Sequence, residues 1–325
     1  FDLGKNFVAK GHQVRLLCRK ADGKPNREIV DGVRIVRHSA FNAPRHLAFA
    51  FLKDLLYSLR TLRHLKKGDV VVTNSVMLPI VNSILGKHAG RYFININRTP
   101  KGQMRLYQFL PISGYAAASE QIRSCVLSEA SGLRDKTFVI HNPVDLDVFS
   151  PPKPNQVERH NRRAGEKKLI LYTGRIHPEK GLEALIQAFG LLANDCQNLS
   201  LRLQGPWKIS EGGGGESYRQ KLEMLAEETL SEEPLNRFEI SDPIYDRHEY
   251  AGTLREADFY CYPTVAEKGE ALPVAPLEAM ATGCLVLRAE VGGMPERLRD
   301  GGKGLLFPAT DAEHLAAKIR QVWPM

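Results

Sequence analysis

Short apolar runs alternate with helix-length segments along nearly the whole chain, and this alternation limits the folds that are open to it. The runs have the length and composition of buried strands, and the segments between them are long enough for crossover helices. Strands joined by such crossovers pair in parallel, so we expect doubly wound α/β domains built on parallel sheets. The expected strands are 13–18, 33–37, 70–73, 92–96, 115–118, 138–141, 169–173, 199–204, 238–240, 259–262 and 284–287.

A polar stretch rich in proline divides this pattern into two halves. Residues 151–166 read P-P-K-P-N-Q-V-E-R-H-N-R-R-A-G-E and show no apolar period, which is typical of a linker. A chain of 325 residues is long enough for two domains of ordinary size. We therefore predict an N-terminal domain over residues 1–150 and a C-terminal domain over residues 167–325.

The composition is that of a soluble globular protein, with 43% hydrophobic and 25% charged residues. No apolar run approaches the roughly 18 residues needed to span a bilayer, and no signal peptide is recognisable. The five cysteines are scattered without a C-x-x-C pair. This usage predicts reduced thiols in the cytoplasm and argues against a structural zinc site.

Positive charge is concentrated in the first half of the chain. Residues 1–150 carry a net charge of +12 and residues 151–325 a net charge of −4. A basic domain suggests an anionic partner, but no nucleic-acid recognition motif is present, so we do not expect nucleic acid. Residues 45–67 mix leucine and phenylalanine with arginine and lysine, which suits an interfacial helix at a membrane or an ordinary helix packed on a sheet.

Two carboxylates eight positions apart form the first candidate site. Between Glu270 and Glu278 lie Pro273 and Pro276, and good helix formers follow. Proline is tolerated in a first helical turn, so we expect a helix to begin near these prolines. Free N–H groups at a helix start favour phosphate, and carboxylates accept hydrogen bonds from sugar hydroxyls. The segment therefore suits a nucleotide sugar, and the alternative is a core helix with two incidental acids.

A second candidate site follows the expected strand 169–173. The loop after it reads G-R-I-H-P-E-K-G and precedes an apolar pattern of helical spacing. Arg175 and Lys180 would then lie at the carboxyl end of a parallel strand, where open α/β sheets bind ligands. Both side chains suit phosphate. A solvated basic loop is the alternative. The four glycines Gly212–Gly215 predict a flexible surface loop in preference to a phosphate cradle, since no Lys-Ser or Lys-Thr follows them.

Together these motifs resemble a known family. G-R-I-H-P-E-K-G, E-A-L-P-V-A-P-L-E-A-M-A-T-G, G-G-M-P-E and D-G-G-K-G-L-L-F occur in this order between residues 174 and 307. The series resembles the retaining glycosyltransferases of the GT-B fold, family 4. The resemblance implies an α/β protein of two Rossmann-like domains facing across a cleft. It places the acceptor in the domain 1–150 and the nucleotide-sugar donor in the domain 167–325.

The resemblance also implies roles for single residues. Arg175 and Lys180 would neutralise the donor diphosphate without a metal or cofactor, and Glu278 would bind the ribose hydroxyls. Glu270 would bind the sugar hydroxyls near the anomeric carbon. The catalytic set is thus Glu270, Arg175 and Lys180, and the donor site adds Gly174, Ala271, Leu272, Val274 and Glu278. Where the family carries a histidine that faces the sugar, this chain offers Asn97, Arg98 and Lys101 as sugar or acceptor contacts.

The implied activity is transfer of a hexose, with retention, from a UDP- or GDP-sugar. The acceptor would be a glycolipid, lipopolysaccharide or polysaccharide, reached from the cytoplasm at the inner face of the plasma membrane. Two alternatives stay open. One is a nucleotide-sugar binding module that truncation has inactivated. The other is a phosphorylase or epimerase of the same fold, although an acid/base set for an epimerase is not recognisable.

The chain departs from the family pattern in three places. Pro273 replaces a glycine, which removes one backbone N–H near the donor. The family's first strand and glycine-rich turn are not found before residue 2, and its last helices are not found after residue 323. We therefore expect an exposed sheet position in the N-terminal domain.

Overall fold

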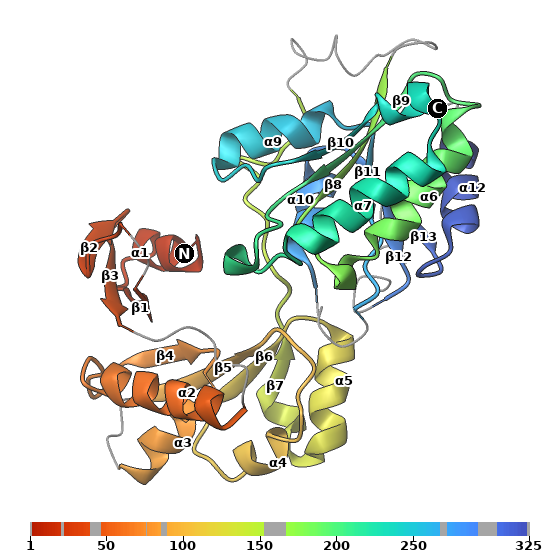
Figure 1. The fold of residues 1–325 in the computed structure, drawn as a ribbon. Helices are drawn as coiled ribbons and strands as arrows, with labels where there is room; N and C mark the ends of the chain where they lie inside the picture. Colours follow the sequence, from red (N-terminus) through yellow and green to blue (C-terminus); the bar gives the residue numbers. More distant parts are fainter. Residues whose placement is uncertain are drawn as a thin grey trace. The chain divides into compact units, whose positions relative to one another are not determined.

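The computed structural model describes residues 2–20, 23–39, 47–75, 77–85, 90–152, 167–266, 272–291 and 304–323 (Figure 1). The chain divides into two compact units. The first unit comprises residues 1–96, 100–117 and 123–138, and the second comprises residues 97–99, 118–122 and 139–325.

The first unit alternates strands and helices. Its elements are α1 (Asp2–Ala9), β1 (Arg15–Arg19), β2 (Arg27–Val30), β3 (Val33–His38), α2 (Leu47–Leu62), β4 (Val70–Thr73), α3 (Met77–Ile84), β5 (Arg91–Ile96), α4 (Met104–Tyr107), β6 (Gly114–Ala117), α5 (Glu120–Glu129), the 3-10 helix η1 (Ser131–Lys136) and β7 (Thr137–Val139). The described strands form two sheets, with orders β1-β3-β2 and β4-β5-β6-β7. The edge strand β4 carries the exposed side chains Val70 and Val72.

Strand β2 corrects the expectation of purely parallel pairing. It was not predicted, and it pairs antiparallel with β3. The two residues that join the strands are Asp31 and Gly32, with φ of 49° and 77°. An Asp-Gly pair between two strands favours a tight hairpin, because both central residues must adopt a positive φ. The Asp-Gly dipeptide was therefore the signal in the sequence that could have revealed this strand.

Helix α2 packs one face against the sheet and leaves another exposed. Leu62 lies in a core cluster with Val71, Leu78, Val81 and Tyr92, and Leu55 packs against that cluster. The side chains of Phe49, Leu52, Leu56 and Leu59 are exposed. Their spacing of three, four and three residues places them along one stripe of the helix.

The second unit is a six-stranded sheet covered by helices on both faces. Its elements are β8 (Lys168–Thr173), η3 (Pro178–Lys180), α6 (Leu182–Ala193), β9 (Leu199–Gln204), η4 (Ile209–Glu211), α7 (Glu216–Thr229), α8 (Glu232–Leu235), β10 (Phe238–Ser241), α9 (Arg247–Glu256), β11 (Phe259–Tyr262), α10 (Val274–Ala281), β12 (Leu285–Ala289), β13 (Gly304–Phe307) and α12 (Ala312–Val322). Helices α6, α7 and α12 lie side by side, and α9 contacts α10 (Figure 1).

All pairings in this sheet are parallel, in the order β10-β9-β8-β11-β12-β13. The chain winds outward from β8 to β9 and β10, then returns to β11 on the other side of β8. The winding direction therefore reverses between β8 and β11. In open α/β sheets the carboxyl ends of the strands at such a reversal are the usual place for a ligand.

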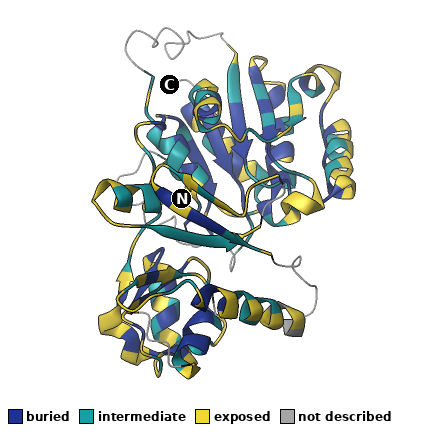
Figure 2. Ribbon diagram, turned by 90° about the vertical axis from the view of Figure 1, so that its left-hand side faces the viewer, coloured by how far each residue is buried: buried dark blue, intermediate teal, exposed yellow. Residues whose placement is uncertain are grey.

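The core of this unit follows the apolar pattern that the sequence shows. Leu182, Leu185, Ile186, Phe189 and Leu192, which predicted the helix after the basic loop, are all fully buried in α6. Figure 2 shows the buried residues concentrated on the central strands. Strand β13 was not predicted. The five expected strands of this half are confirmed within two residues at each end.

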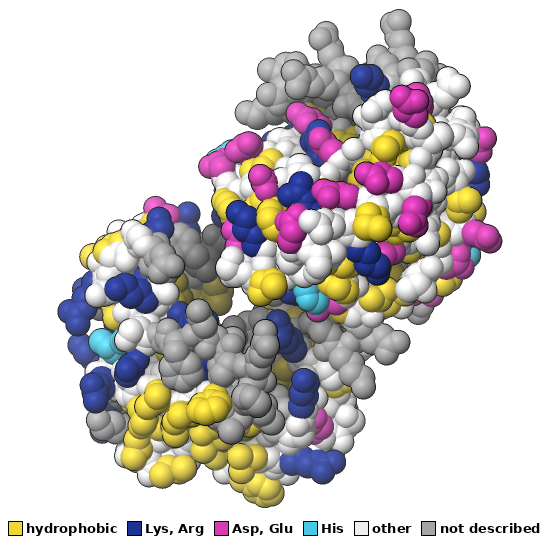
Figure 3. Space-filling view, in the orientation of Figure 1, with side chains coloured by type: hydrophobic (Ala, Val, Ile, Leu, Met, Phe, Trp, Pro, Cys, Tyr) yellow, Lys and Arg dark blue, Asp and Glu magenta, His cyan; other side chains and the backbone are white. Residues whose placement is uncertain are grey.

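Figure 3 shows one face of the molecule, on which the two units differ in their charged side chains. Lysine and arginine side chains predominate over the first unit, whereas aspartate and glutamate are frequent over the second. Among the described helices, none is both long and apolar enough to cross a membrane.

Candidate functional site

The strands β8 and β11 separate at their carboxyl ends. Their backbones pair only at Phe259 with Ile170 and at Tyr260 with Leu171. Beyond this ladder the rings of Tyr172 and Tyr262 stack with centroids 6.0 Å apart. The predicted basic loop begins here, so the structure confirms the strand–loop–helix arrangement and places it where the winding of the sheet reverses.

Two glycines shape the loop that leaves β8. Gly174 has a φ of 147°, and a Cβ atom on it would lie 2.8 Å from the hydroxyl of Tyr172. Gly181 has a φ of 64°, and its Cβ would lie 2.4 Å from the carbonyl oxygen of Pro263. Both φ values favour glycine over any other residue. Gly181 also joins η3 to α6, so the close approach of the chain just after β11 to this turn fixes the residue before it, Lys180.

Lys180 is a buried lysine at the carboxyl ends of these two strands. Its side chain is 6% exposed. The Nζ atom donates a hydrogen bond to the hydroxyl of Tyr262 at 3.1 Å and lies 3.7 Å from a carboxylate oxygen of Glu179. Burying an ammonium group is costly unless it is paired, and these two contacts provide the pairing.

Arg175 is held on the other side of Glu179. Its guanidinium pairs with the Glu179 carboxylate and donates to the carbonyl oxygen of Gly212 at 3.0 Å. Partial burial by itself would raise the pKa of Glu179, but Arg175, Lys180 and His177 together lower that pKa below its ordinary value. The loop thus carries three basic side chains around one ionised carboxylate, and its net charge is positive.

The four-glycine loop is packed more closely than the surface loop that the sequence suggested. Each of its N–H groups donates to a backbone carbonyl, and the acceptors are Ile209, Lys208, Ile176 and Trp207 in order. Gly213 and Gly215 are buried, and a Cβ on Gly213 would lie 2.2 Å from the backbone of Trp207. Because all four N–H groups are occupied, they are not available to cradle a phosphate.

Glu278 reaches the same region from helix α10, through a tyrosine. The hydroxyl of Tyr250 lies 2.8 Å from that of Thr173 and is hydrogen-bonded to Glu278. Burial, together with the negative charge of Glu278, raises the pKa of Tyr250. The hydroxyl of Tyr260 in turn donates to the carbonyl oxygen of Thr173 at 3.0 Å. Thr173 directly precedes Gly174, so this network connects the predicted acid on α10 to the predicted basic loop.

The start of α10 confirms the helix expected from the two prolines. Val274 is its first residue and Pro273 its N-cap. Leu272 is buried, and its carbonyl oxygen accepts a hydrogen bond from the side-chain amide of Asn142 at 2.6 Å. Val274 is partly exposed beside it. Glu270 and Ala271 lie outside the described residues.

The residues predicted to contact the acceptor follow strand β5. Asn97, Arg98 and Lys101 are all exposed. The backbone just beyond them is fixed by the carboxylate of Glu129, which accepts from the N–H groups of Gly102 at 2.7 Å and Met104 at 3.2 Å. Their role in acceptor binding stays a prediction.

Sequence reasoning missed the aromatic side of this site. Tyr250, Tyr260 and Tyr262 were not singled out, nor was Arg288, which is fully buried with its guanidinium 5.9 Å from the ring of Tyr262. The signals were an arginine inside an apolar strand and the alternating tyrosines of F-Y-C-Y. Within the described ranges, no group of three or more His, Cys, Asp or Glu side chains is arranged to hold a metal ion.

Two family profiles match the chain. Residues 155–323 match the family described as "Glycosyl transferases group 1", and residues 1–148 match "Glycosyltransferase Family 4".

The curated relatives that match the chain are named as glycosyltransferases. The chain is 33% identical over 187 residues to a D-inositol 3-phosphate glycosyltransferase of Geodermatophilus obscurus, a match that covers 58% of this chain and 40% of that protein. It is 24% identical over 341 residues to a D-inositol 3-phosphate glycosyltransferase of Catenulispora acidiphila, covering 98% of this chain and 80% of the relative. The first of these matches spans less than half the length of the relative.

Solved structures show a similar fold at low sequence identity. Sucrose-phosphate synthase of Thermosynechococcus elongatus superposes with a TM-score of 0.77 at 21% identity, covering 99% of this chain and 82% of the other. HepE of Anabaena, solved with UDP and glucose, superposes with a TM-score of 0.69 at 17% identity, covering 95% and 89%.

Proposed function

Because the chain belongs to the family of group 1 glycosyl transferases, we propose that it transfers a hexose from a nucleoside-diphosphate sugar, with retention of anomeric configuration. The predicted resemblance and the GT-B class of two Rossmann-like domains are confirmed by the family match and by the similar folds. The observation that carries the proposal is the buried ammonium group of Lys180 at the reversal point of the second sheet. A fixed cation at that place suits the phosphates of a donor.

The diphosphate would bind against Lys180 and Arg175. Departure of the nucleoside diphosphate leaves negative charge on a phosphate oxygen, and preorganised cations stabilise that charge most strongly where water is excluded. Lys180 is already dehydrated, so it needs little reorganisation. Arg175 is shared with Glu179 and with the Gly212 carbonyl, and its remaining N–H groups suit a second phosphate. We expect these two side chains to take the place of a metal ion.

The sugar hydroxyls would be bound by the carboxylates. Glu278 is oriented by Tyr250, and a carboxylate in this position accepts hydrogen bonds from the ribose. Glu270 precedes α10 in sequence and is assigned to the hexose. Gly174, Ala271, Leu272 and Val274 would supply backbone contacts around the donor. The acceptor hydroxyl would attack from the side of the departing phosphate, which then receives the proton.

The acceptor is proposed to be a glycolipid, lipopolysaccharide or polysaccharide. Asn97, Arg98 and Lys101 are exposed in the loop after β5 and are assigned to the acceptor or the hexose. The exposed apolar stripe of α2, with Arg60 in the last turn of the helix, supports contact with an anionic membrane surface. We therefore propose peripheral association with the inner face of the plasma membrane.

The test is calorimetric titration of the full chain with UDP, GDP and ADP, followed by the matching sugar nucleotides without acceptor. We expect micromolar binding of one nucleotide and slow hydrolysis with retained configuration. Lys180→Ala should weaken binding of the free diphosphate about tenfold or more, and Glu278→Gln should weaken it by a smaller factor. The matched control is Lys208→Ala, an exposed lysine in the same unit.

Three outcomes contradict parts of this proposal. Unchanged affinity in both variants removes the donor site from this position. Tight binding of a sugar nucleotide without turnover, even when acceptors are supplied, favours the binding module. Formation of an epimer, or release of sugar phosphate in the presence of phosphate, favours the epimerase or the phosphorylase.

A further inference from the structure

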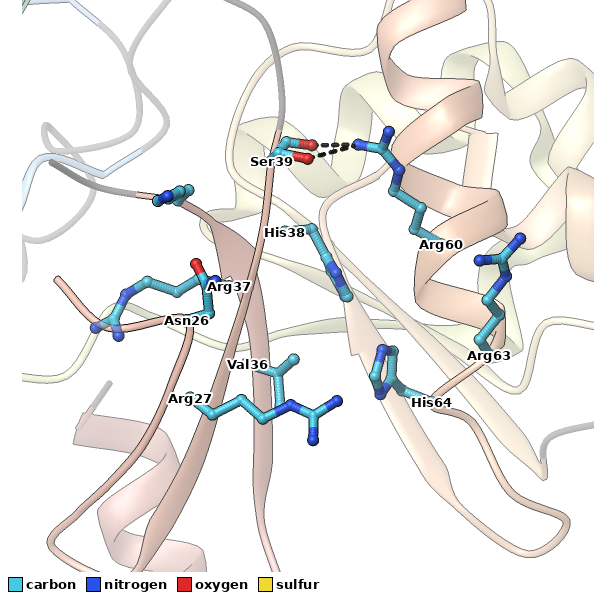
Figure 4. Close-up of a pocket in the computed structure, with 10 residues that line it drawn as sticks. Asn26, Arg27, Val36, Arg37, His38, Ser39, Arg60, Arg63 and His64 are labelled. Atoms are coloured by element: carbon cyan, nitrogen blue, oxygen red, sulfur yellow. Dashed lines mark hydrogen bonds between the residues drawn. The ribbon is translucent and has the colours of Figure 1, made fainter.

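A strongly basic pocket lies in the first unit, whereas the residues assigned to the donor belong to the second. Its volume is about 450 Å³, and it opens between the β1-β3-β2 sheet and the end of α2 (Figure 4). Of the ten residues that line it, five are lysine or arginine and two are histidine, and none of the ten is acidic. The five cations are Lys20, Arg27, Arg37, Arg60 and Arg63.

The cations converge from different parts of the unit. Lys20 follows strand β1 and Arg27 begins β2, whereas Arg60 lies in the last turn of α2 and Arg63 just beyond it. The pocket includes the carboxyl ends of the parallel strands β1 and β3, which is where open α/β sheets bind ligands. Basic residues at a helix end can simply offset the helix dipole, but Lys20 and Arg27 come from the sheet and have no such role.

Two acidic side chains of this unit, Glu28 and Asp69, are already paired. Glu28 forms an ion pair with Arg37, and Asp69 forms one with Arg15. Arg60 donates to the backbone carbonyl and, at 3.3 Å, to the hydroxyl of Ser39. Within the described part of the chain, no carboxylate forms an ion pair with Lys20, Arg27 or Arg63. The pocket therefore holds positive charge that the described residues do not neutralise.

Two histidines lie at the centre of the pocket, where a bound ligand would supply a missing hydrogen bond. His38 and His64 point toward each other, with ring centroids 4.9 Å apart (Figure 4). Among the described residues, no hydrogen-bond partner meets the buried Nε2 atom of His38. A buried polar atom of this kind ordinarily has a partner, so a bound acceptor would satisfy it.

We propose that this pocket binds the phosphate group of a molecule of about monosaccharide size. Arginine side chains grip phosphate oxygens with paired N–H groups, and two imidazole rings add donors from the buried end. The volume is that of a small-molecule site, larger than a single phosphate ion requires. The bearer of the phosphate is a free phosphorylated sugar or a lipid headgroup, which share this chemistry. The proposal does not depend on the transferase activity proposed above.

The histidines give the site a pH dependence with a definite sign. Burial, followed by the charges of His64, Arg60 and Arg27, lowers the pKa of His38. Burial, followed by Arg27, Arg15 and Arg63, lowers the pKa of His64. A bound phosphate dianion offsets these cations and raises both pKa values, so binding takes up protons. Affinity should therefore increase as the pH falls toward about 6, where the ligand itself takes up its second proton, and decrease as the pH rises.

The test follows the histidine ring signals of the full chain by NMR. Inorganic phosphate and glucose 6-phosphate are titrated separately, with chloride at matched ionic strength as the reference. We expect saturable shifts of two histidines and an increase in both pKa values with phosphate, and neither effect with chloride. His38→Gln and His64→Gln assign the two signals.

Substitutions at exposed arginines locate the site, because they should not unfold the protein. Arg27 and Arg63 are exposed, so Arg27→Gln and Arg63→Gln should fold normally. Each should weaken phosphate binding about tenfold, whereas the control Arg134→Gln, an exposed arginine elsewhere in the unit, should leave it unchanged. An equal loss in all three variants would show that only overall charge matters, and would overturn the proposal.

A vesicle experiment distinguishes the two sources of the phosphate. Phosphatidic acid vesicles, whose headgroup is a phosphomonoester, are sedimented with the wild-type chain and with the Arg27→Gln, Arg63→Gln double variant. Tighter binding of glucose 6-phosphate than of inorganic phosphate identifies a free phosphorylated sugar as the ligand. Loss of vesicle binding in the double variant, with equal affinity for the two soluble phosphates, identifies a lipid headgroup. If the variants bind soluble phosphates and vesicles as strongly as the wild type does, the pocket is not a phosphate site.

Discussion

The hydroxyl of Tyr250 lies 2.8 Å from the hydroxyl of Thr173, and the same tyrosine is hydrogen-bonded to Glu278. Three elements meet in this arrangement: α9 carries the tyrosine, β8 ends at the threonine, and α10 carries the carboxylate. Glu278 is therefore oriented by a group that belongs to neither of the two sequence motifs. Its position relative to the loop of Arg175 and Lys180 depends on that group.

Replacing Tyr250 by phenylalanine should loosen Glu278 without removing it. The variant loses one neutral hydrogen bond and one to a charged group, so we expect the free energy of unfolding to decrease by about 1–3 kcal/mol. Nucleotide affinity should decrease several-fold if Glu278 binds the ribose. Tyr245→Phe is the control, because Tyr245 is 74% exposed. Denaturant titration and calorimetry measure the two effects, and equal values for both variants would contradict a positioning role.

Gly181 should not tolerate alanine. A Cβ atom would lie 2.4 Å from the Pro263 carbonyl oxygen, and the φ of 64° is itself unfavourable for alanine. We expect Gly181→Ala to cost more than about 1 kcal/mol of stability and to lower nucleotide affinity by displacing Lys180. In contrast, Gly252 lies in α9 with nothing within 4 Å of the added atom. Gly252→Ala should stabilise the protein by up to about 1 kcal/mol, and thermal unfolding of both variants measures the contrast.

Glu179 should make stability sensitive to acid. The pKa of this carboxyl is lower in the folded protein than its ordinary value of 4.5, because Arg175, Lys180 and His177 outweigh the effect of burial. Its contribution to stability is therefore complete above the ordinary pKa and is lost as the pH falls through the folded-state pKa. Wild type should be more stable than Glu179→Gln near neutral pH, and the difference should shrink below about pH 4.

The control for this pH series is Glu228→Gln, at an exposed glutamate in α7. Chemical denaturation is repeated at several pH values for the three proteins. A stability difference between wild type and Glu179→Gln that stays constant across the series would show that the surrounding cations do not favour the ionised carboxylate.

The outer stripe of α2 should contribute to membrane binding. Leu52 and Leu56 are 44% and 38% exposed on the face that does not pack against the sheet. Leu52→Gln with Leu56→Gln should leave stability almost unchanged and should weaken binding to anionic vesicles about tenfold or more. Ile209→Gln, at a 78% exposed residue of the second unit, serves as the control. Equal sedimentation of all three proteins would restrict α2 to a packing role.

The sequence predicted most of the second unit because each of its elements is locally specified. Apolar strands such as 199–204 and 259–262 are confirmed to the residue, and Val274 begins the helix that Pro273 and Pro276 predicted. Strand β2 was missed because its residues R-E-I-V are two charged side chains followed by two apolar ones, and only the Asp-Gly turn indicates the hairpin. Four residues that show no period of two cannot be identified as a strand without their turn.

The sequence alone determined which charged residues could bind a phosphate and where strands and helices alternate. Tertiary structure decided what surrounds those charges. The burial of Lys180 against Tyr262, the link from Glu278 through Tyr250 to Thr173, and the occupied N–H groups of Gly212–Gly215 all join residues far apart in the chain. Local propensity contains no information about such pairs, because dehydration and hydrogen bonding between distant residues arise only when the sheet brings its strand ends together.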